Sequence, residues 1–191
     1  MMKKLVLFII VCFIILMGTS VHAKWYGMIY YAVLAGPGIE DALLLSAEFD
    51  TSYRLLAAAI GKQIYQYNEH LVFDLEGQAV QHLGAQSHAE WNGVFIARWL
   101  TFPWNHKLRT TIAFGEGLSY AAKTPNIEKL HNEKVSHLLN YLSFEFTFAL
   151  PQAKRFLLLT RLHHRSGVYG LFNDVKGASN AVGVGVRYEF D

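Results

Sequence analysis

The segment Leu71-Val-Phe-Asp-Leu-Glu-Gly-Gln-Ala-Val-Gln-His82 decides the fold, because apolar and polar side chains alternate along it. Successive side chains of an extended strand point to opposite faces, so this alternation predicts a strand with one apolar and one polar face. The apolar face carries Leu71, Phe73, Leu75 and Ala79, and the polar face carries Asp74, Glu76, Gln78 and His82. A strand of about ten residues with this pattern is typical of a membrane barrel, in which apolar side chains contact lipid and polar ones face the lumen.

Two later segments repeat the pattern. Between 88 and 102, the outward set is Trp91, Phe95, Ala97 and Trp99, and the inward set is Glu90, Asn92 and Arg98. Between 137 and 150, the outward set is Leu138, Leu142, Phe144, Phe146 and Phe148, and the inward set is Tyr141, Ser143 and Glu145. Aromatic residues gather at the segment ends, as in interfacial girdles: Trp25, Tyr65, Trp99, Trp104, Tyr120 and Tyr188. A soluble antiparallel sandwich shares the alternation but needs neither these girdles nor a secretion signal.

Tight turns alternate with longer connections along the chain. The tight turns lie at 67–70, 103–106 and 151–154, and the longer connections at 84–87, 121–136 and 167–177. Outer-membrane barrels place short turns on the periplasmic side and long loops outside, so the last strand runs toward the periplasm. Seven strands are expected at 52–66, 70–83, 88–102, 106–120, 136–150, 154–166 and 178–190.

An even strand number requires an eighth strand. Either 25–34 or 41–49 can supply it, and we favour 25–34, with 36–50 as an extended outer loop. The expected fold is therefore all-β, an eight-stranded antiparallel transmembrane β-barrel whose final strand ends close to an aromatic residue, Phe190. So small a barrel is filled by its own side chains, which argues against a wide diffusion pore.

The first 23 residues have the form of a cleaved signal peptide. Lys3 and Lys4 precede an apolar run from Leu5 to Met17, and Val-His-Ala ends the segment at Ala23. The run is shorter than the about 20 residues that a membrane-spanning helix needs, which disfavours a retained helix. We therefore expect a signal peptide at 1–23, one barrel domain at 24–191, and a location in a bacterial outer membrane.

The composition excludes several classes of function. The only cysteine, Cys12, lies within the signal, so the mature chain has no disulfide and no thiol nucleophile. A formal net charge of +2, without a run of like charges, gives no reason to expect nucleic acid as a partner. Hydrophobic residues make up 52% of the chain, yet no second apolar run is long enough for a helical span, so the apolar residues must be spread over strands.

The strongest local signal for chemistry lies in the strand expected at 154–166. Its parity places Arg155, Arg161, His163 and Arg165 in the lumen, which leaves His164 and Ser166 on the lipid-facing side at the outer end. Residues two apart on one face have Cα atoms about 6.5–7 Å apart, close enough for an imidazole to reach a serine hydroxyl. The alternative is that both residues are simply interfacial polar groups, bonded to lipid headgroups or water.

At this point the chain resembles the outer-membrane lipid A 3-O-deacylases of the PagL type and their acyloxyacyl-hydrolase-like relatives. The resemblance rests on His164-x-Ser166, on the following loop with Gly167, Gly170, Asn173 and Gly177, and on the terminal Arg187-Tyr-Glu-Phe190. It covers about the last 35 residues, while the barrel pattern covers the mature chain.

The resemblance implies that His164 is the general base and Ser166 the nucleophile of an ester hydrolase acting on lipid A in the outer leaflet. The family's assisting glutamate falls at or beside Asn180, so this chain departs from the family there. An asparagine can orient an imidazole but cannot stabilise the imidazolium by charge, so a slower or altered reaction is expected. Asp174 and Glu116 are alternative acids, and the simplest explanation of Glu116 on an apolar face is a bulge near Gly115 and Gly117.

The expected partners are lipid A and other outer-membrane lipids. Arg165 and Lys176 are the nearest cations in sequence to the site and are candidates to hold lipid phosphates, although solvated loop charge is the simpler explanation of each one alone. Neither the residues nor the resemblance calls for a cofactor. Four histidines, His82, His88, His163 and His164, lie toward the outer end. We nevertheless assign no metal, because adjacent His163 and His164 face opposite sides of one strand and cannot bind the same ion.

The competing hypothesis is a non-enzymatic barrel whose inward charges plug the lumen and whose loops bind partners. Those inward charges are Asp74, Glu76, Glu90, Arg98, Glu145, Arg161 and Arg187. The sequence leaves open whether the barrel is a monomer or a homodimer, and which acyl chain or lipid would be cleaved.

Overall fold

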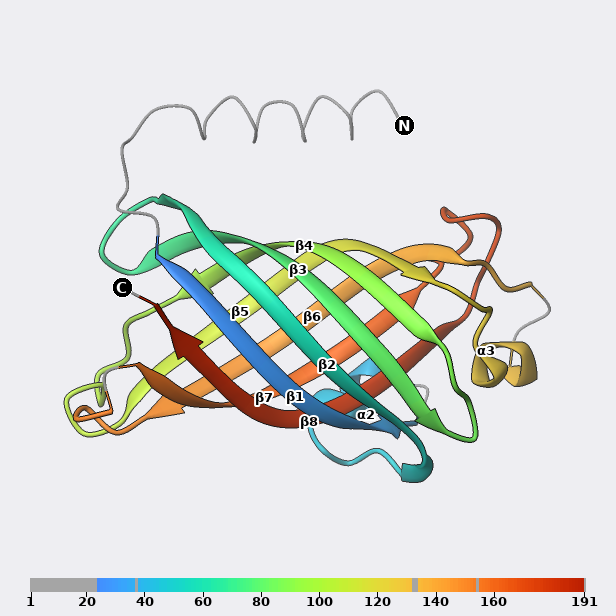
Figure 1. Cartoon of the computed structure of the whole chain (residues 1–191), viewed down its shortest axis with the longest axis horizontal. Helices are drawn as coiled ribbons and strands as arrows, with labels where there is room; N and C mark the ends of the chain where they lie inside the picture. Colours follow the sequence, from blue (N-terminus) through green and yellow to red (C-terminus); the bar gives the residue numbers. More distant parts are fainter. Residues whose placement is uncertain (1–23, 37, 132–133, 154, 191) are drawn as a thin grey trace.

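The computed structural model describes residues 24–36, 38–131, 134–153 and 155–190. Within them the chain forms a closed antiparallel barrel in which each strand pairs with its sequence neighbours and β1 pairs with β8 (Figure 1). The strands are β1 (Trp25–Ala35), β2 (Phe49–Gln66), β3 (Leu71–Gly84), β4 (Ala89–Trp99), β5 (Arg109–Ala121), β6 (Leu138–Ala149), β7 (Phe156–Ser166) and β8 (Ala178–Glu189). The eight-stranded barrel expected from the sequence is confirmed. The signal predicted at 1–23 lies outside the described residues.

The choice of the first strand is confirmed, since β1 spans Trp25–Ala35 and pairs on one side with β2 and on the other with β8. Two short helices that the sequence pattern did not predict lie in the long connections, α2 (Ile39–Leu43) and α3 (Asn126–His131). Both lie near the end of the barrel opposite the C-terminus, and α2 lies against the outside of the wall (Figure 1). No helix among the described residues is long and apolar enough to cross a membrane.

The outer surface of the barrel is apolar. Side chains that alternate outward stay largely exposed, among them Ile29 at 55%, Ile60 at 56%, Leu158 at 65% and Val184 at 66%. Leaving so many large apolar side chains in water would be costly, whereas lipid chains solvate them well. This apolar belt around a closed barrel is the architecture of an outer-membrane protein, and closure leaves no unpaired strand edge in the membrane.

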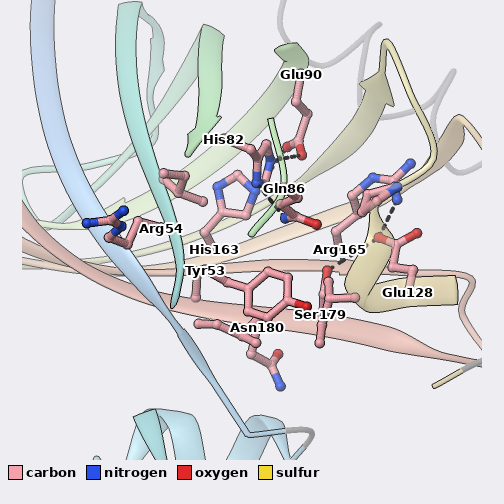
Figure 2. A pocket seen from close by; sticks show the side chains of 15 residues that line it. Tyr53, Arg54, His82, Gln86, Glu90, Glu128, His163, Arg165, Ser179 and Asn180 are labelled. Carbon is pink, nitrogen blue, oxygen red and sulfur yellow. Dashed lines mark hydrogen bonds and ion pairs between the residues drawn. The ribbon is translucent and has the colours of Figure 1, made fainter. Parts of the chain in front are cut away.

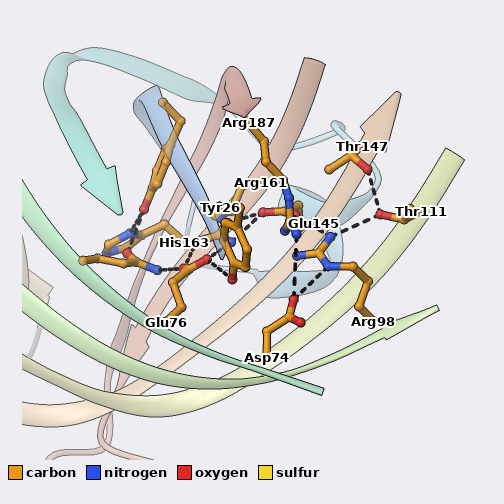
Figure 3. Close-up of polar contacts among 12 residues, drawn as sticks. Tyr26, Asp74, Glu76, Arg98, Thr111, Glu145, Thr147, Arg161, His163 and Arg187 are labelled. Atoms are coloured by element: carbon orange, nitrogen blue, oxygen red, sulfur yellow. Dashed lines mark hydrogen bonds and ion pairs between the residues drawn. The ribbon is translucent and has the colours of Figure 1, made fainter. Parts of the chain in front are cut away.

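A buried network of ion pairs fills the middle of the lumen (Figure 3). The Arg161 guanidinium donates to Glu76 Oε1 at 2.7 Å and from Nε to Glu145 Oε2 at 2.9 Å. Arg98 donates to Glu145 Oε1 at 2.7 Å and to Asp74 Oδ2 at 3.1 Å. These side chains are almost fully buried, so each charge depends on its partners for stabilisation. The predicted plug of inward charges is confirmed.

One predicted lumen residue lies elsewhere. Arg155 precedes β7, is exposed, and donates to Tyr188 Oη at 3.2 Å on the outside of the barrel. Parity predicts the face of a residue only while the strand is regular, and β7 begins one residue later, at Phe156.

Candidate functional site

His164 and Asn180 are direct cross-strand partners on the outside of the barrel. The β7–β8 register pairs His164 with Asn180 and Ser166 with Ala178. The His164 Nδ1 and Asn180 Oδ1 atoms are 2.6 Å apart, within hydrogen-bonding distance. The third side chain of the predicted site thus contacts the histidine from the adjacent strand.

The Asn180 amide has its orientation fixed by a second contact. Its Nδ2 donates to the Gly36 carbonyl oxygen at 2.9 Å, and a carbonyl can only accept. Oδ1 must therefore face the imidazole, so His164 Nδ1 carries the proton and donates it to the amide. The Nε2 atom of neutral His164 then holds its lone pair, which is the tautomer that a general base requires.

The segment of residues 38–48, which contains α2, covers this part of the barrel wall. Ala42 packs with Ala35 and Leu162 in an apolar cluster, and all three are buried. Ile39, Ala47, Phe144 and Val182 pack around them. This contact explains why Leu162 and Asn180, which point away from the lumen, are only 4% and 1% exposed.

Ser166 lies at the end of β7, opposite Asn140 of β6. Gly167 follows it, and a Cβ there would lie 1.9 Å from the Val175 carbonyl oxygen, so only glycine allows the chain to turn away at this point. Ser166 is 9% exposed. Within the described part of the chain, neither Ser166 Oγ nor His164 Nε2 makes a hydrogen bond, to each other or to another group.

The other residues proposed from the sequence lie at several places. Glu116 is on the lipid-facing side of β5 without any bulge, because both of its strand pairings are in continuous register, so the bulge expected there is wrong. The Glu116 side chain interacts with Asn140. Asp174 is exposed and pairs with Lys134 at 3.1 Å, away from His164. Lys176 is exposed in the β7–β8 loop.

Arg165 cannot hold a lipid phosphate on the outside of the barrel, because it points into the lumen. Its guanidinium pairs with Glu128 of α3 and donates to the carbonyl oxygens of Ser136 and His137 at 2.8 and 2.7 Å. The residue instead ties the β5–β6 connection to the outer end of the lumen.

A second polar cluster lies on the inner side of the same end, beside a pocket that residues of β1–β4, β7, β8 and α3 line (Figure 2). Glu90 accepts from His82 Nε2 at 2.9 Å and from His163 Nε2 at 3.0 Å. The rings of His82 and His88 stack with centroids 4.1 Å apart. Burial, and then the neighbouring His82 ring, lower the pKa of His88 to about 4.

Two features of these sites were missed from the sequence. Asn140 stands opposite Ser166, and its outward parity among leucines and phenylalanines was the available signal. The sequence placed His82 and His88 toward the outer end but did not group them with Glu90, because His88 precedes β4 and has no strand parity that shows where it points.

Comparison with known proteins relates the chain to small outer-membrane barrels. Neither family models nor curated protein sequences give a match. Among solved structures, neisserial surface protein A is similar with a TM-score of 0.51 and 13% identity, over 89% of this chain and all of that one. The N-terminal barrel domain of Pseudomonas aeruginosa OprF gives 0.48 and 10% identity, over 87% of this chain and 97% of that one. Ail of Yersinia pestis gives 0.42 and 9% identity, over 88% and 98%.

At such low identity the similarity to neisserial surface protein A concerns the fold alone. Together with the strand order and the apolar outer belt, it shows that the chain folds as a small outer-membrane β-barrel.

Proposed function

We propose that the barrel is a serine esterase that removes an ester-linked acyl chain from lipid A or a related outer-leaflet lipid. The observation that carries the proposal is the Gly36–Asn180–His164 chain of contacts, which fixes the proton on His164 Nδ1 and leaves Nε2 as a base.

In the proposed reaction, His164 Nε2 accepts the Ser166 proton while Ser166 Oγ attacks the ester carbonyl. The imidazolium then returns the proton to the leaving alkoxide, which frees the deacylated lipid and leaves an acyl-serine. Water attacks this ester with His164 as base, and the fatty acid departs. Ser166 and His164 lie two residues apart on one face, so a side-chain rotation brings them into contact, and such contacts are often long before substrate binds.

The surroundings of the site suit a lipid substrate. Leu43, Leu44 and Leu45 in the covering segment are 40%, 78% and 63% exposed, and Leu171 in the β7–β8 loop is 56% exposed. Acyl chains can pack against these side chains, which supplies binding energy away from the reacting ester. Asn140, the strand partner of Ser166, carries a side-chain amide that could donate to the developing oxyanion.

Mass spectrometry of lipid A tests the proposal. Cells expressing the wild-type chain should lose one acyl mass from lipid A, whereas cells expressing Ser166→Ala or His164→Ala at equal outer-membrane levels should not. Ser179→Ala is a matched control, because this serine lies on the neighbouring strand but faces the lumen and the pocket there. The host is one in which an authentic deacylase of this type cleaves lipid A. If lipid A then stays unchanged in cells expressing the wild-type chain, the proposal is contradicted for that lipid.

The second candidate is a non-enzymatic barrel. It is favoured by the low exposure of Ser166 and by the lack of a hydrogen bond from Ser166 to any described residue. In that case His164 and Asn180 hold the backbone at Gly36 against the wall, and lipid A stays unchanged in every variant.

A further inference from the structure

The outer end of the lumen holds a cluster with the composition of a metal site. One ligand atom from each of His82, His88 and Glu90 lies within 4.8 Å of the others. His82 comes from β3, Glu90 from β4 and His88 from the connection between them, and the backbone bond from His82 N to His88 O, 2.9 Å long, holds the two histidines side by side. All three residues are buried.

Two buried polar atoms beside the cluster have no partner among the described residues. They are His88 Nε2 and Gln86 Oε1. A buried polar atom left unpaired is costly, so the His88 nitrogen indicates a partner that the described side chains do not supply. His88 is only 6% exposed, and its unpaired nitrogen belongs to the same ring that stacks on His82.

The surrounding residues can support an ion bound at this point. A histidine bound to a metal usually donates its other ring N–H to an oxygen, which fixes the ring. Gln86 is placed for that role, since its amide contacts His82 Nδ1 at 3.0 Å. Turning the amide by half a rotation lets Oε1 accept from His82 Nδ1–H, which frees the lone pair of His82 Nε2 for the ion and leaves Gln86 Nε2 as the amide atom without a described partner.

Glu90 is held from the opposite side. Its Oε1 accepts from His163 Nε2 at 3.0 Å, and His163 Nδ1 contacts Tyr30 Oη at 2.9 Å. Its Oε2, which now accepts from His82, would then bind the ion together with His82 Nε2. These two atoms are 2.9 Å apart, close to the about 3.3 Å between neighbouring ligands of tetrahedral zinc. A ring nitrogen binds an ion in the plane of its ring, so His88 joins them by leaving its stacked position on His82.

We propose that His82, His88 and Glu90 bind one divalent transition-metal ion of the zinc type at the outer end of the lumen. Two imidazoles and one carboxylate select zinc, copper or nickel over calcium and magnesium, which prefer oxygen ligands. The adjoining pocket, which His82, Gln86 and Glu90 line, gives the ion a route to the cluster (Figure 2). Binding there ties the β3–β4 connection to the lumen and is independent of the proposed esterase site on the other side of the wall.

Calorimetric titration with zinc tests the proposal. The mature barrel is purified in detergent through a tag that contains no histidine, treated with EDTA and dialysed, and then titrated with zinc chloride. We expect one ion per barrel. His88→Ala should lower the association constant for zinc by more than about 100-fold. Gln86→Leu should lower it by about 10- to 100-fold, which is the usual effect of removing a residue that hydrogen-bonds to a metal ligand. His106→Ala, in the turn at the other end of the barrel, should bind as the wild type does.

A second measurement separates binding from misfolding. Cobalt bound by nitrogen ligands absorbs visible light, and this absorption should appear in the wild type and in His106→Ala but be absent in His88→Ala. The fold of each variant is checked by its heat-dependent mobility in SDS gels. Absence of saturable zinc binding by the wild type, or equal affinity of wild type and folded His88→Ala, would overturn the proposal.

Discussion

Replacing Arg161 by methionine should destabilise the barrel strongly. The Arg161 guanidinium is fully buried in the lumen and pairs with Glu76 and Glu145, which are themselves 1% exposed. Methionine fills most of the same volume but leaves both carboxylates without this partner. Glu145 keeps its bond from Arg98 Nη1 at 2.7 Å, whereas Glu76 keeps only neutral donors, Tyr26 Oη at 2.8 Å and Gln78 Nε2 at 2.8 Å.

The Arg161→Met variant should lose about 3–5 kcal/mol of unfolding free energy, which is the usual cost of removing one partner of a buried ion pair. With a urea dependence of about 2 kcal/mol per molar, the unfolding midpoint should fall by about 2 M. The double variant Arg161→Met/Glu76→Gln removes the uncompensated charge as well, so it should regain about 1–3 kcal/mol relative to Arg161→Met.

Reversible urea unfolding in lipid vesicles, followed by tryptophan fluorescence, measures these differences. Arg155→Met is the matched control, because Arg155 is exposed outside the lumen, and its effect should stay within about 0.5 kcal/mol. A loss below about 1 kcal/mol for Arg161→Met, or no recovery in the double variant, would refute the view that this pairing stabilises the lumen.

Three further predictions concern the outer end of the barrel. Asn180→Ala should lower lipid deacylation by about 10²-fold or more, measured as fatty acid release, because the His164 tautomer is no longer fixed. Ala42→Asp should speed hydrogen exchange of the α2 amides by about tenfold or more, since a carboxylate cannot stay in the cluster with Leu162. The low pKa of His88, about 4 against the usual 6.5, means that the unfolded chain binds more protons between these values. The free energy of unfolding should therefore fall as the pH drops from about 6.5 to about 4. Over the same pH range, the urea midpoint of His88→Gln should fall less than that of the wild type.

The faces of the strands could be predicted from the sequence because alternation in a strand depends only on local geometry. Asp74, Glu76 and Glu145 lie in the lumen as their parity requires, and Phe144 and Leu158 lie outside. The pairing of His164 with Asn180 was also within reach, because adjacent strands joined by one loop have a register that their ends define.

Contacts across the lumen could not be predicted in this way. Arg161 meets Glu76 across 85 residues of sequence, and which inward charges meet depends on the tilt and stagger of the whole barrel. The connection at 36–50 was expected only as a loop, because α2 is too short to show a helical period. Its position is decided by packing against Leu162, a tertiary contact that leaves no local pattern.

The most direct test of the proposed function asks whether Ser166 is an activated nucleophile, whatever lipid the barrel acts on. The folded barrel in detergent is incubated with a long-chain alkyl fluorophosphonate, which forms a phosphonate ester with an activated serine and releases fluoride. Intact-mass spectrometry should find one adduct per barrel, peptide mapping should place it on Ser166, and His164→Ala should abolish it. An unmodified wild-type barrel, or equal labelling of wild type and His164→Ala, would contradict the proposal that His164 and Ser166 form a catalytic pair.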